Sequence, residues 1–407
     1  MPPLAPILSR LAGTGGDKWA VHFRACALAA EGREIIALTI GEPDLPTPGA
    51  LIDVAADAMR AGRTRYSNGQ GEPGLRRALA ARYSASTGRA IAPDQILCFP
   101  GTQTALYTVM AGLAAEGDEV LVGDPLYATY EGVIRASGAR MVGVPLRPLR
   151  GFRMDAADLA AAITARSRVI LLNTPHNPTG AVLRDEDIDA IGALARAHDL
   201  WILCDEVYAE LIFGARAHVS PLARADLADR VIVVSSISKS HAAPGFRSGW
   251  AVGPADWAAR QLALCEVMLF SNQPFIADMT EAAIAAPCDT TREIRDRLAR
   301  RAGLLAEGLR DCPGLAVHRP EAGMFALLDV SGLGMDGESY AFDLLERAGV
   351  AVMPGAAFGS RLGSWVRVAL TVPDDTLRQA VARIRDHAGA RHGRDHVGAR
   401  HGRDAAG

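Results

Sequence analysis

The apolar positions in the middle of the chain fall into short runs that are separated by longer amphipathic segments. The runs are rich in Val, Ile and Leu, as is typical of strands buried on both faces of a parallel sheet. Segment 185–199 begins with acidic residues and places Ile188, Ile191 and Leu194 at helical spacing, and 104–115 also reads as a helix. Strands that alternate with helices predict an α/β sheet covered on both faces. The predicted strands are residues 95–99, 119–122, 168–172, 200–204, 231–235 and 249–252.

This pattern changes after Pro254, where residues 290–310 form a long amphipathic stretch that we predict to be a helix linking two domains. Strands at residues 314–318, 324–330, 350–353 and 365–370, with a helix at 339–348, would build the second, smaller domain. We expect an N-terminal arm and part of the small domain in 1–44, the large domain in 45–285, and the linking helix with the small C-terminal domain in 286–386.

The last part of the chain carries a tandem nine-residue repeat, HAGARHGRD at 387–395 and HVGARHGRD at 396–404. Two copies are too few for a repeat fold, which needs about three units to bury a core. The Gly, Arg and His content favours a disordered tail over 387–407, with metal binding as the weaker alternative.

Charge and cysteine usage exclude several classes of protein. The chain has 43 Lys+Arg and 46 Asp+Glu, a net charge of −3, which argues against nucleic acid as a partner. No apolar run approaches the roughly 20 residues of a membrane-spanning helix, and the N-terminus shows no secretory signal. The six cysteines contain no C-x2-C pair. We therefore expect a cytoplasmic protein without zinc or membrane contact.

A lysine follows the apolar run 231–235 directly, where α/β sheets bind their ligands. Ser236 stands three residues before Lys239, and Arg247 stands eight residues after it, in a glycine-containing segment. A hydroxyl, a guanidinium and a flexible backbone together suit a phosphate group. Taken alone, a surface lysine in a loop would be the better interpretation of Lys239.

Three further strand ends carry polar residues. Gly101, Thr102 and Gln103 follow one run at the predicted start of a helix, where free N–H groups attract an anion, although a plain helix cap would look the same. Asp205 directly follows the run 200–204, and burying a carboxylate there costs free energy unless it meets a cation. Asn177 lies in an Asn-Pro turn, which by itself is ordinary turn chemistry.

In combination these segments resemble the fold type I aminotransferases that use pyridoxal 5′-phosphate, specifically the class I/II group around aspartate aminotransferase. The resemblance extends from about residue 10 to about residue 385 and implies an α/β large domain with a mostly parallel seven-stranded sheet, plus a smaller α+β domain built from both chain ends. The matching segments, in family order, are residues 41–44, 66–71, 101–103, 124–127, 177–180, 205–208, 236–239, 245–247 and 365–367.

The resemblance assigns a role to each residue of the cofactor ring site. Lys239 corresponds to the lysine that forms the internal aldimine and then moves a proton between the substrate α-carbon and the cofactor. Asp205 would pair with the ring nitrogen and keep it protonated, so that the ring can accept electrons. Asn177 and Tyr208 would bond the phenolic oxygen, and Tyr127 would stack on the ring.

The resemblance also implies how the two ends of the site are built. The phosphate would bind to the Thr102 and Gln103 backbone, Ser236 and Arg247, and Tyr66 would come from the partner subunit of a homodimer with shared active sites. Arg367, Gly41 and Asn177 would contact the substrate. Arg367 would bind the substrate α-carboxylate through two parallel hydrogen bonds.

Within the family, residues 19–25, 127–131, 238–241 and 323–325 look most like the arginine:pyruvate transaminase branch. A guanidino side chain requires a carboxylate, for which we choose Asp17 because its segment matches the arm over the substrate. An exposed glycine-rich loop is the alternative interpretation of this segment, and Glu131, Glu266 and Asp278 are alternative carboxylates.

We therefore predict a ping-pong transfer of an amino group from an arginine-like amino acid to pyruvate or a similar 2-oxo acid. Antibiotic pathways that build amino acids such as enduracididine would use this chemistry. A broad alanine- or aromatic-type aminotransferase and other cofactor chemistry, such as β-elimination or oxidation, are alternatives. A transcription regulator built on this fold needs a DNA-binding domain, for which the roughly 40 residues before Gly41 are too few.

Overall fold

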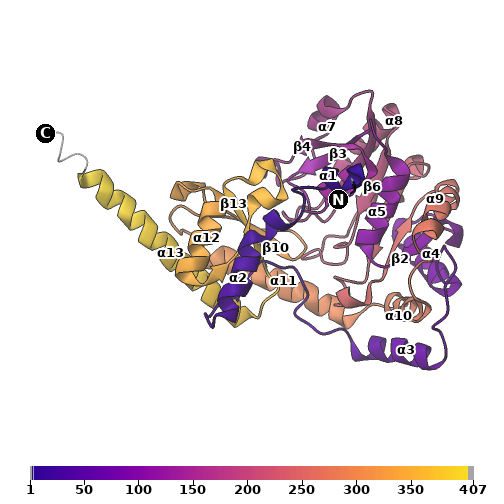
Figure 1. Ribbon diagram of the computed structural model, residues 1–407, viewed down its shortest axis with the longest axis horizontal. Helices are drawn as coiled ribbons and strands as arrows, with labels where there is room; N and C mark the ends of the chain where they lie inside the picture. The colour runs from indigo at the N-terminus through magenta and orange to yellow at the C-terminus, as the bar shows by residue number, and fades with distance from the viewer. Residues whose placement is uncertain (1, 3, 402–407) are drawn as a thin grey trace.

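The computed structural model describes residue 2 and residues 4–401, without the side chains of residues 17 and 392–401. The described chain forms a large α/β domain and a smaller domain beside it (Figure 1). In Figure 1 the large domain holds the magenta and salmon elements, and the orange and yellow elements lie mostly in the smaller one.

The large domain is built on a seven-stranded sheet with the strand order β2-β8-β7-β6-β5-β3-β4. Strand β8 runs antiparallel to β2 and β7, while the other neighbouring pairs are parallel. This confirms the predicted α/β fold with a mostly parallel sheet. The strands are β2 (Ile96–Phe99), β3 (Glu119–Asp124), β4 (Arg140–Pro145), β5 (Ser167–Asn173), β6 (Trp201–Asp205), β7 (Val231–Ser236) and β8 (Gly249–Val252).

Both faces of this sheet are covered by helices, which explains why its central strands read as continuous apolar runs. In β6, Ile202 belongs to the apolar cluster on one face and Leu203 to the cluster on the other. Helices α5 (Thr102–Leu113), α6 (Tyr130–Ser137) and α9 (Ala255–Met268) contribute to the Leu203 face. The Ile202 face is covered by α3 (Gly49–Arg60), α4 (Pro73–Thr87), α7 (Ala156–Ala162), α8 (Asp185–Ala197) and α10 (Pro274–Ile284).

Strand β4 is missing from the strands predicted by the apolar pattern. It lies at the edge of the sheet, and most of its residues are partly or fully exposed. Arg140, Gly143 and Pro145 interrupt its apolar positions. Because an edge strand faces solvent, it lacks the buried run by which the other strands were predicted.

The smaller domain combines an antiparallel sheet of order β12-β13-β10-β9 with a two-stranded parallel pair, β1 and β11. Strand β1 belongs to the N-terminal segment and β11 to the C-terminal one, so both ends of the chain meet here. The predicted strand 350–353 is split at Val352, because its halves pair in different sheets. The bounds are β1 (Ile36–Ala37), β9 (Ala316–His318), β10 (Phe325–Asp329), β11 (Val350–Ala351), β12 (Met353–Pro354) and β13 (Trp365–Ala369).

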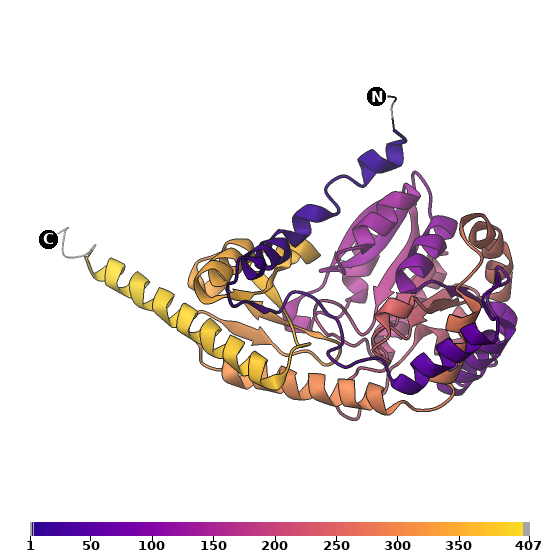
Figure 2. The ribbon, with the colours of Figure 1, turned by 60° about the horizontal axis from the view of Figure 1, so that its bottom comes forward.

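Four helices pack around the smaller domain: α2 (Ala20–Ala30), α11 (Asp289–Gly308), α12 (Gly337–Ala348) and α13 (Asp374–His401). Helix α11 is the predicted linking helix and runs along the underside of the molecule in Figure 2. Its fully buried Arg301 binds Asp44 at 2.6 Å and Asp374 at 2.9 Å. These ion pairs connect the segment that enters the large domain to the start of α13.

Helix α13 continues past residue 387, so the prediction that a disordered tail begins there is wrong. His387 Nε2 and Arg391 Nε lie 2.6 and 3.0 Å from Asp343 Oδ2 on α12, and Ala388 is buried. These contacts give the first residues of the repeat a tertiary partner, which the composition argument did not foresee. The helix projects away from the body in both views, and residues 402–407 lie outside the described residues.

Within the part of the chain that the structure describes, no helix is long and apolar enough to cross a membrane. The same residues contain no group of three His, Cys, Asp or Glu side chains that could hold a metal ion.

Candidate active site

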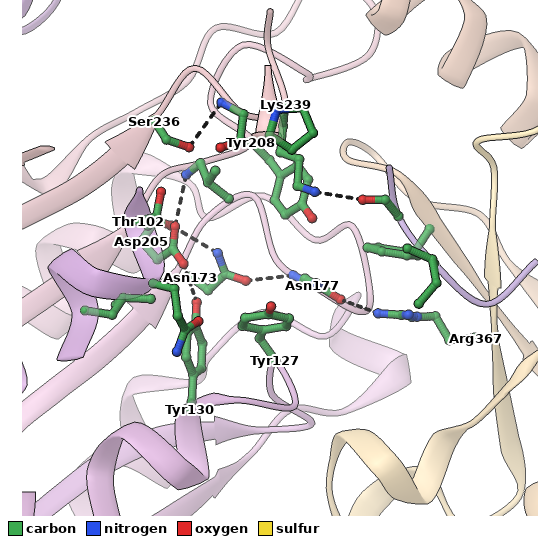
Figure 3. Close-up of a pocket in the computed structure, with 18 of the residues that line it drawn as sticks. Thr102, Tyr127, Tyr130, Asn173, Asn177, Asp205, Tyr208, Ser236, Lys239 and Arg367 are labelled. Carbon is green, nitrogen blue, oxygen red and sulfur yellow. Dashed lines mark hydrogen bonds between the residues drawn. The ribbon is translucent and has the colours of Figure 1, made fainter. Parts of the chain in front are cut away.

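A cavity of about 260 Å³ opens where the polar strand ends of the large sheet meet the smaller domain (Figure 3). The carboxyl ends of parallel strands share one edge of a sheet, and the amino end of the antiparallel β8 lies at that same edge. The predicted site residues that line the cavity are Gly41, Thr102, Gln103, Tyr127, Asn177, Asp205, Tyr208, Ser236, Lys239, Arg247 and Arg367.

Lys239 lies just after β7, and its Nζ donates a hydrogen bond of 2.7 Å to the Gly41 carbonyl oxygen. Burial lowers the pKa of Lys239 to about 8; the charges of Arg367 and Arg247 act in the same direction, and Glu42 opposes them. A lysine in this state is partly neutral near pH 7, so its amine can act as a nucleophile or accept a proton.

Asp205 ends β6, is buried and lines the same cavity. Its Oδ2 accepts a hydrogen bond from the Tyr130 hydroxyl at 2.8 Å, and its Oδ1 accepts one from the Val207 N–H at 3.1 Å. Burial raises the pKa of Asp205 to about 6, because no cationic side chain among the described residues pairs with it. The carboxylate is therefore suited to a cationic group of a ligand in the cavity.

Tyr130 and Asn173 also line the cavity, and the sequence reasoning gave neither of them a role in the site. Asn173 is the register partner of Asp205 on the neighbouring strand. Its Nδ2 donates to the Asp205 carbonyl oxygen at 3.0 Å, and its Oδ1 accepts from the Asn177 N–H at 2.7 Å. The available signal was that Asn173 ends an apolar run, as Asp205 does.

Several hydrogen-bond donors converge where the cavity meets the start of helix α5. The helix α5 begins at Thr102, so its first N–H groups have no partner within the helix. The Thr102 Oγ1 is buried and has no partner in the described structure. Ser236 and Arg247 lie beside it, and a Cβ on Gly249 would come within 2.6 Å of the Gly101 carbonyl carbon. This close backbone approach leaves a donor-rich hollow that suits a phosphate group.

Arg367 projects from β13 into the cavity and is only 2% exposed. Its Nη1 donates to Asn177 Oδ1 at 3.2 Å and its Nη2 to the Thr39 carbonyl oxygen at 2.7 Å. The rings of Phe325 and Phe358 lie 3.8 and 4.2 Å from its guanidinium carbon. Burial lowers the pKa of Arg367 to about 9, and its buried Nε has no partner within the described chain. An anionic ligand would supply the missing counter-charge.

Two of the predicted site residues are not among the described residues that line the cavity. Tyr66 is 91% exposed and packs on Phe270, with 5.8 Å between the ring centroids. Asp17 falls in the short 3-10 helix η1 (Gly16–Trp19), and its side chain lies outside the described residues, although its neighbour Trp19 lines the cavity.

The alternative carboxylates have other surroundings. Glu131 pairs with Lys18 at 2.8 Å and with Arg135 at 2.6 Å. Asp278 binds Arg63 at 2.6 Å. Glu266 lies against Gly69, where an added Cβ would come within 2.6 Å of its Cγ.

A family model described as "Aminotransferase class I and II" matches residues 33–384. The chain belongs to this family. An arginine–pyruvate transaminase from Pseudomonas aeruginosa is 42% identical to this aminotransferase over 377 residues, which cover 92% of this chain and 95% of that protein. An aspartate aminotransferase from Streptomyces avermitilis is 34% identical, covering 90% of this chain and 92% of that one.

The fold of the aminotransferase also matches solved structures. A double mutant of the Thermus thermophilus aspartate aminotransferase superimposes with a TM-score of 0.89 at 31% identity, over 95% of this chain and all of that chain. Family membership makes the protein an enzyme that uses pyridoxal 5′-phosphate. The cavity of this aminotransferase fits that cofactor at three points: the unpartnered Thr102 hydroxyl suits the phosphate, Asp205 suits the ring nitrogen, and Lys239 suits the aldehyde.

Proposed function

We propose that this aminotransferase moves the amino group of a guanidino-type L-amino acid to pyruvate or a similar 2-oxo acid in two half-reactions. The observation that carries the proposal is Arg367, a buried guanidinium in the cavity with no carboxylate partner in the described residues. A substrate α-carboxylate completes this site. The resemblance to the arginine–pyruvate transaminase supports the choice of amino donor.

The residues around the cavity would hold the cofactor at four places. The backbone at Thr102 and Gln103, with Ser236 and Arg247, would bind the phosphate. The ring nitrogen would pair with Asp205, the phenolic oxygen would accept hydrogen bonds from Asn177 and Tyr208, and Tyr127 would stack on the ring. When bound, pyridoxal 5′-phosphate carries the amino group between the two half-reactions and withdraws electrons from the substrate α-carbon.

The chain itself supplies orientation and proton transfer. Arg367 binds the substrate carboxylate as a planar fork, which fixes the direction of the α-carbon–hydrogen bond, and Gly41 and Asn177 lie beside that carboxylate. Lys239 Nζ would accept the proton from the substrate α-carbon and hold it for delivery to the cofactor. Burial favours the neutral amine that this step requires.

Recognition of a guanidino group requires a carboxylate near the cavity mouth. Among the described residues that line the cavity, the single carboxylate is Asp205, which is assigned to the cofactor. Glu131 and Asp278 are already paired with cations. We therefore keep Asp17, two residues before the lining Trp19, as the residue that binds the guanidino group.

We also propose a homodimer in which Tyr66 completes the partner's site. The exposed Tyr66 and Phe270 rings fit a surface that a second copy covers.

All six cysteines are free, in keeping with the reducing conditions of the cytoplasm.

A half-reaction tests the proposed substrate. Purified holoenzyme is mixed with single amino acids, and the change in cofactor absorbance is followed by stopped flow. We expect arginine-like donors to react with a kcat/KM at least about 10-fold above that for alanine, phenylalanine and aspartate. Faster reaction with alanine or aromatic donors would favour the broad-specificity alternative, and release of ammonia without a 2-oxo acid acceptor would favour β-elimination. Testing cyclic guanidino amino acids of the enduracididine type in the same panel addresses the antibiotic pathway.

A further inference from the structure

A second acidic residue follows Asp205 directly, and its side chain lies away from the cavity. Glu206 is 3% exposed, and its N–H donates to the Val234 carbonyl oxygen at 2.9 Å. Whereas Asp205 lines the cavity, Glu206 lies near Cys204, which belongs to the apolar cluster on the opposite face of the sheet. Two carboxylates on neighbouring residues are thus buried on opposite sides of one strand end.

The partner of Glu206 is a histidine from the same connection between β6 and β7. His218 Nε2 lies 3.2 Å from Glu206 Oε2, and both side chains are largely buried. The contact is an ion-pair distance without hydrogen-bond geometry, since neither ring nitrogen of His218 has a hydrogen-bond partner in the described structure. No arginine or lysine pairs with Glu206 among the described residues, and its Oε1 has no hydrogen-bond partner there. A buried carboxylate needs a nearby positive charge, and His218 is the group that can supply it.

The other titratable groups near this pair do not replace His218. Tyr83 lies close enough to Glu206 to feel its charge, which adds to burial in raising the pKa of Tyr83. The Tyr83 hydroxyl accepts a hydrogen bond from Trp250 Nε1 at 2.9 Å. Burial also raises the pKa of Cys204. Further out, Arg82 is bound to Glu210 at 2.5 Å. Burial lowers the pKa of His241, while the charges of Glu210 and Arg82 act on it in opposite directions. The ring nitrogens of His241 are bonded to the Ser240 hydroxyl and the Ala283 carbonyl oxygen.

We infer that Glu206 and His218 form a charge-balancing pair that tunes Asp205 from the far side of the sheet. His218 is a positioning residue here, since it acts on the cofactor through Asp205 and touches no reacting atom. The inference rests on the proposed function, in which ionised Asp205 holds the cofactor ring nitrogen. An unbalanced charge on Glu206 disfavours a second negative charge next to it. A positive charge on His218, 3.2 Å from Glu206, would cancel that charge and so favour the ionised form of Asp205.

The pairing predicts that losing His218 and losing Glu206 change the ionisation of Asp205 in opposite directions. Replacing His218 by Gln leaves Glu206 uncompensated, so Asp205 should ionise less readily and the cofactor should bind more weakly. Replacing Glu206 by Gln removes the competing charge, so Asp205 should ionise more readily. A purely structural pair would instead weaken the protein in the same direction when either member is lost.

The experiment measures the dissociation constant of pyridoxal 5′-phosphate for apoenzyme between pH 5 and 9. Wild type, Glu206→Gln, His218→Gln, the double variant and the control Glu210→Gln are compared, and apoenzyme melting is recorded for each. In His218→Gln we expect the acidic limb of the affinity profile to shift to higher pH by about one unit. At a given pH on that limb, this shift is about a 10-fold loss of cofactor affinity. The limb should shift to lower pH in Glu206→Gln, return towards the wild-type position in the double variant, and stay in place in Glu210→Gln.

Shifts in the same direction for both single variants, or no shift in either, would overturn the inference. If His218→Gln does not fold, the direction of the Glu206→Gln shift decides alone. An additional arm separates the two levels of the argument. If Asp205→Asn leaves cofactor affinity unchanged, the proposed role of Asp205 fails; if Asp205→Asn weakens binding but the pair variants show no opposed shifts, only the pairing inference fails.

Discussion

Lys239 Nζ and the Gly41 carbonyl oxygen lie 2.7 Å apart although 198 positions separate the two residues in the chain. Gly41 belongs to the segment that runs from the smaller domain into the large one, whereas Lys239 follows the central strand β7. The amine proposed to carry the proton is therefore held between the two domains.

Replacement of Lys239 by Ala should lower kcat by at least about 10⁴-fold, because the proton carrier is lost. The chain contains only two lysines, Lys18 and Lys239, and Lys18 is paired with Glu131. Reduction of the holoenzyme with borohydride followed by peptide mapping should therefore place the cofactor on Lys239. Lys18→Ala is the matched control and should keep both the label and the cofactor absorbance; label on Lys18 would contradict the assignment.

Arg367→Lys should raise KM for amino acids about 100-fold while changing cofactor affinity little. A lysine is a single charge point and cannot form the planar, two-sided contact of a guanidinium with a carboxylate. Steady-state kinetics and cofactor titration would measure the two effects separately. Arg361→Lys, outside the lining of the cavity, serves as the control. An equal loss in cofactor affinity would show that Arg367 acts on the cofactor instead.

Asp205 should make the stability of the apoenzyme depend on pH. Burial raises its pKa from 3.8 to about 6, so the folded state holds its proton more tightly than the unfolded state. The stabilisation from protonated Asp205 is present below about pH 4 and is lost as the pH rises through about 6. Apoenzyme carrying Asp205→Asn should thus gain up to about 3 kcal/mol over wild type at pH 7 and almost nothing at pH 3.5. Denaturant unfolding at both pH values tests this, and a gain that is equal at both would rule it out.

Tyr66 provides a test of the shared active site. In the proposed dimer, one subunit with Lys239→Ala and one with Tyr66→Ala would form one intact site and one doubly damaged site. Refolding an equal mixture of the two variants should restore about a quarter of wild-type activity, because half of the dimers are mixed and each carries one good site. Activity that stays at the average of the two parents would show that Tyr66 serves its own subunit or none.

Asp17→Asn should raise KM for arginine-like donors much more than KM for alanine, by about 10-fold against less than 2-fold. The carboxylate meets the guanidino group only, whereas the α-carboxylate site is common to both donors. Trp19→Phe, at the neighbouring lining position, should instead alter both donors together. Equal effects of Asp17→Asn on the two donors would remove this residue from the account of specificity.

Sequence patterns predicted the buried part of the fold well. The runs that became β2, β3 and β5 to β8 are apolar because these strands are covered on both faces, and that local signal does not depend on knowing their neighbours. The edge strand β4 and the division of 350–353 between two sheets were not visible. Both depend on which strand lies alongside, and a run of residues does not encode this locally.

The sequence by itself determined which polar residues end the strands, and because parallel strands end at one edge, it determined that Thr102, Asn177, Asp205 and Lys239 share one site. The tertiary structure alone decided the state of these groups. Burial lowers the pKa of Lys239 and raises that of Asp205, and the contact between Glu206 and His218 joins two residues with no shared motif. Solvation and charge pairing depend on the surrounding atoms in three dimensions, so these properties follow from packing and not from local pattern.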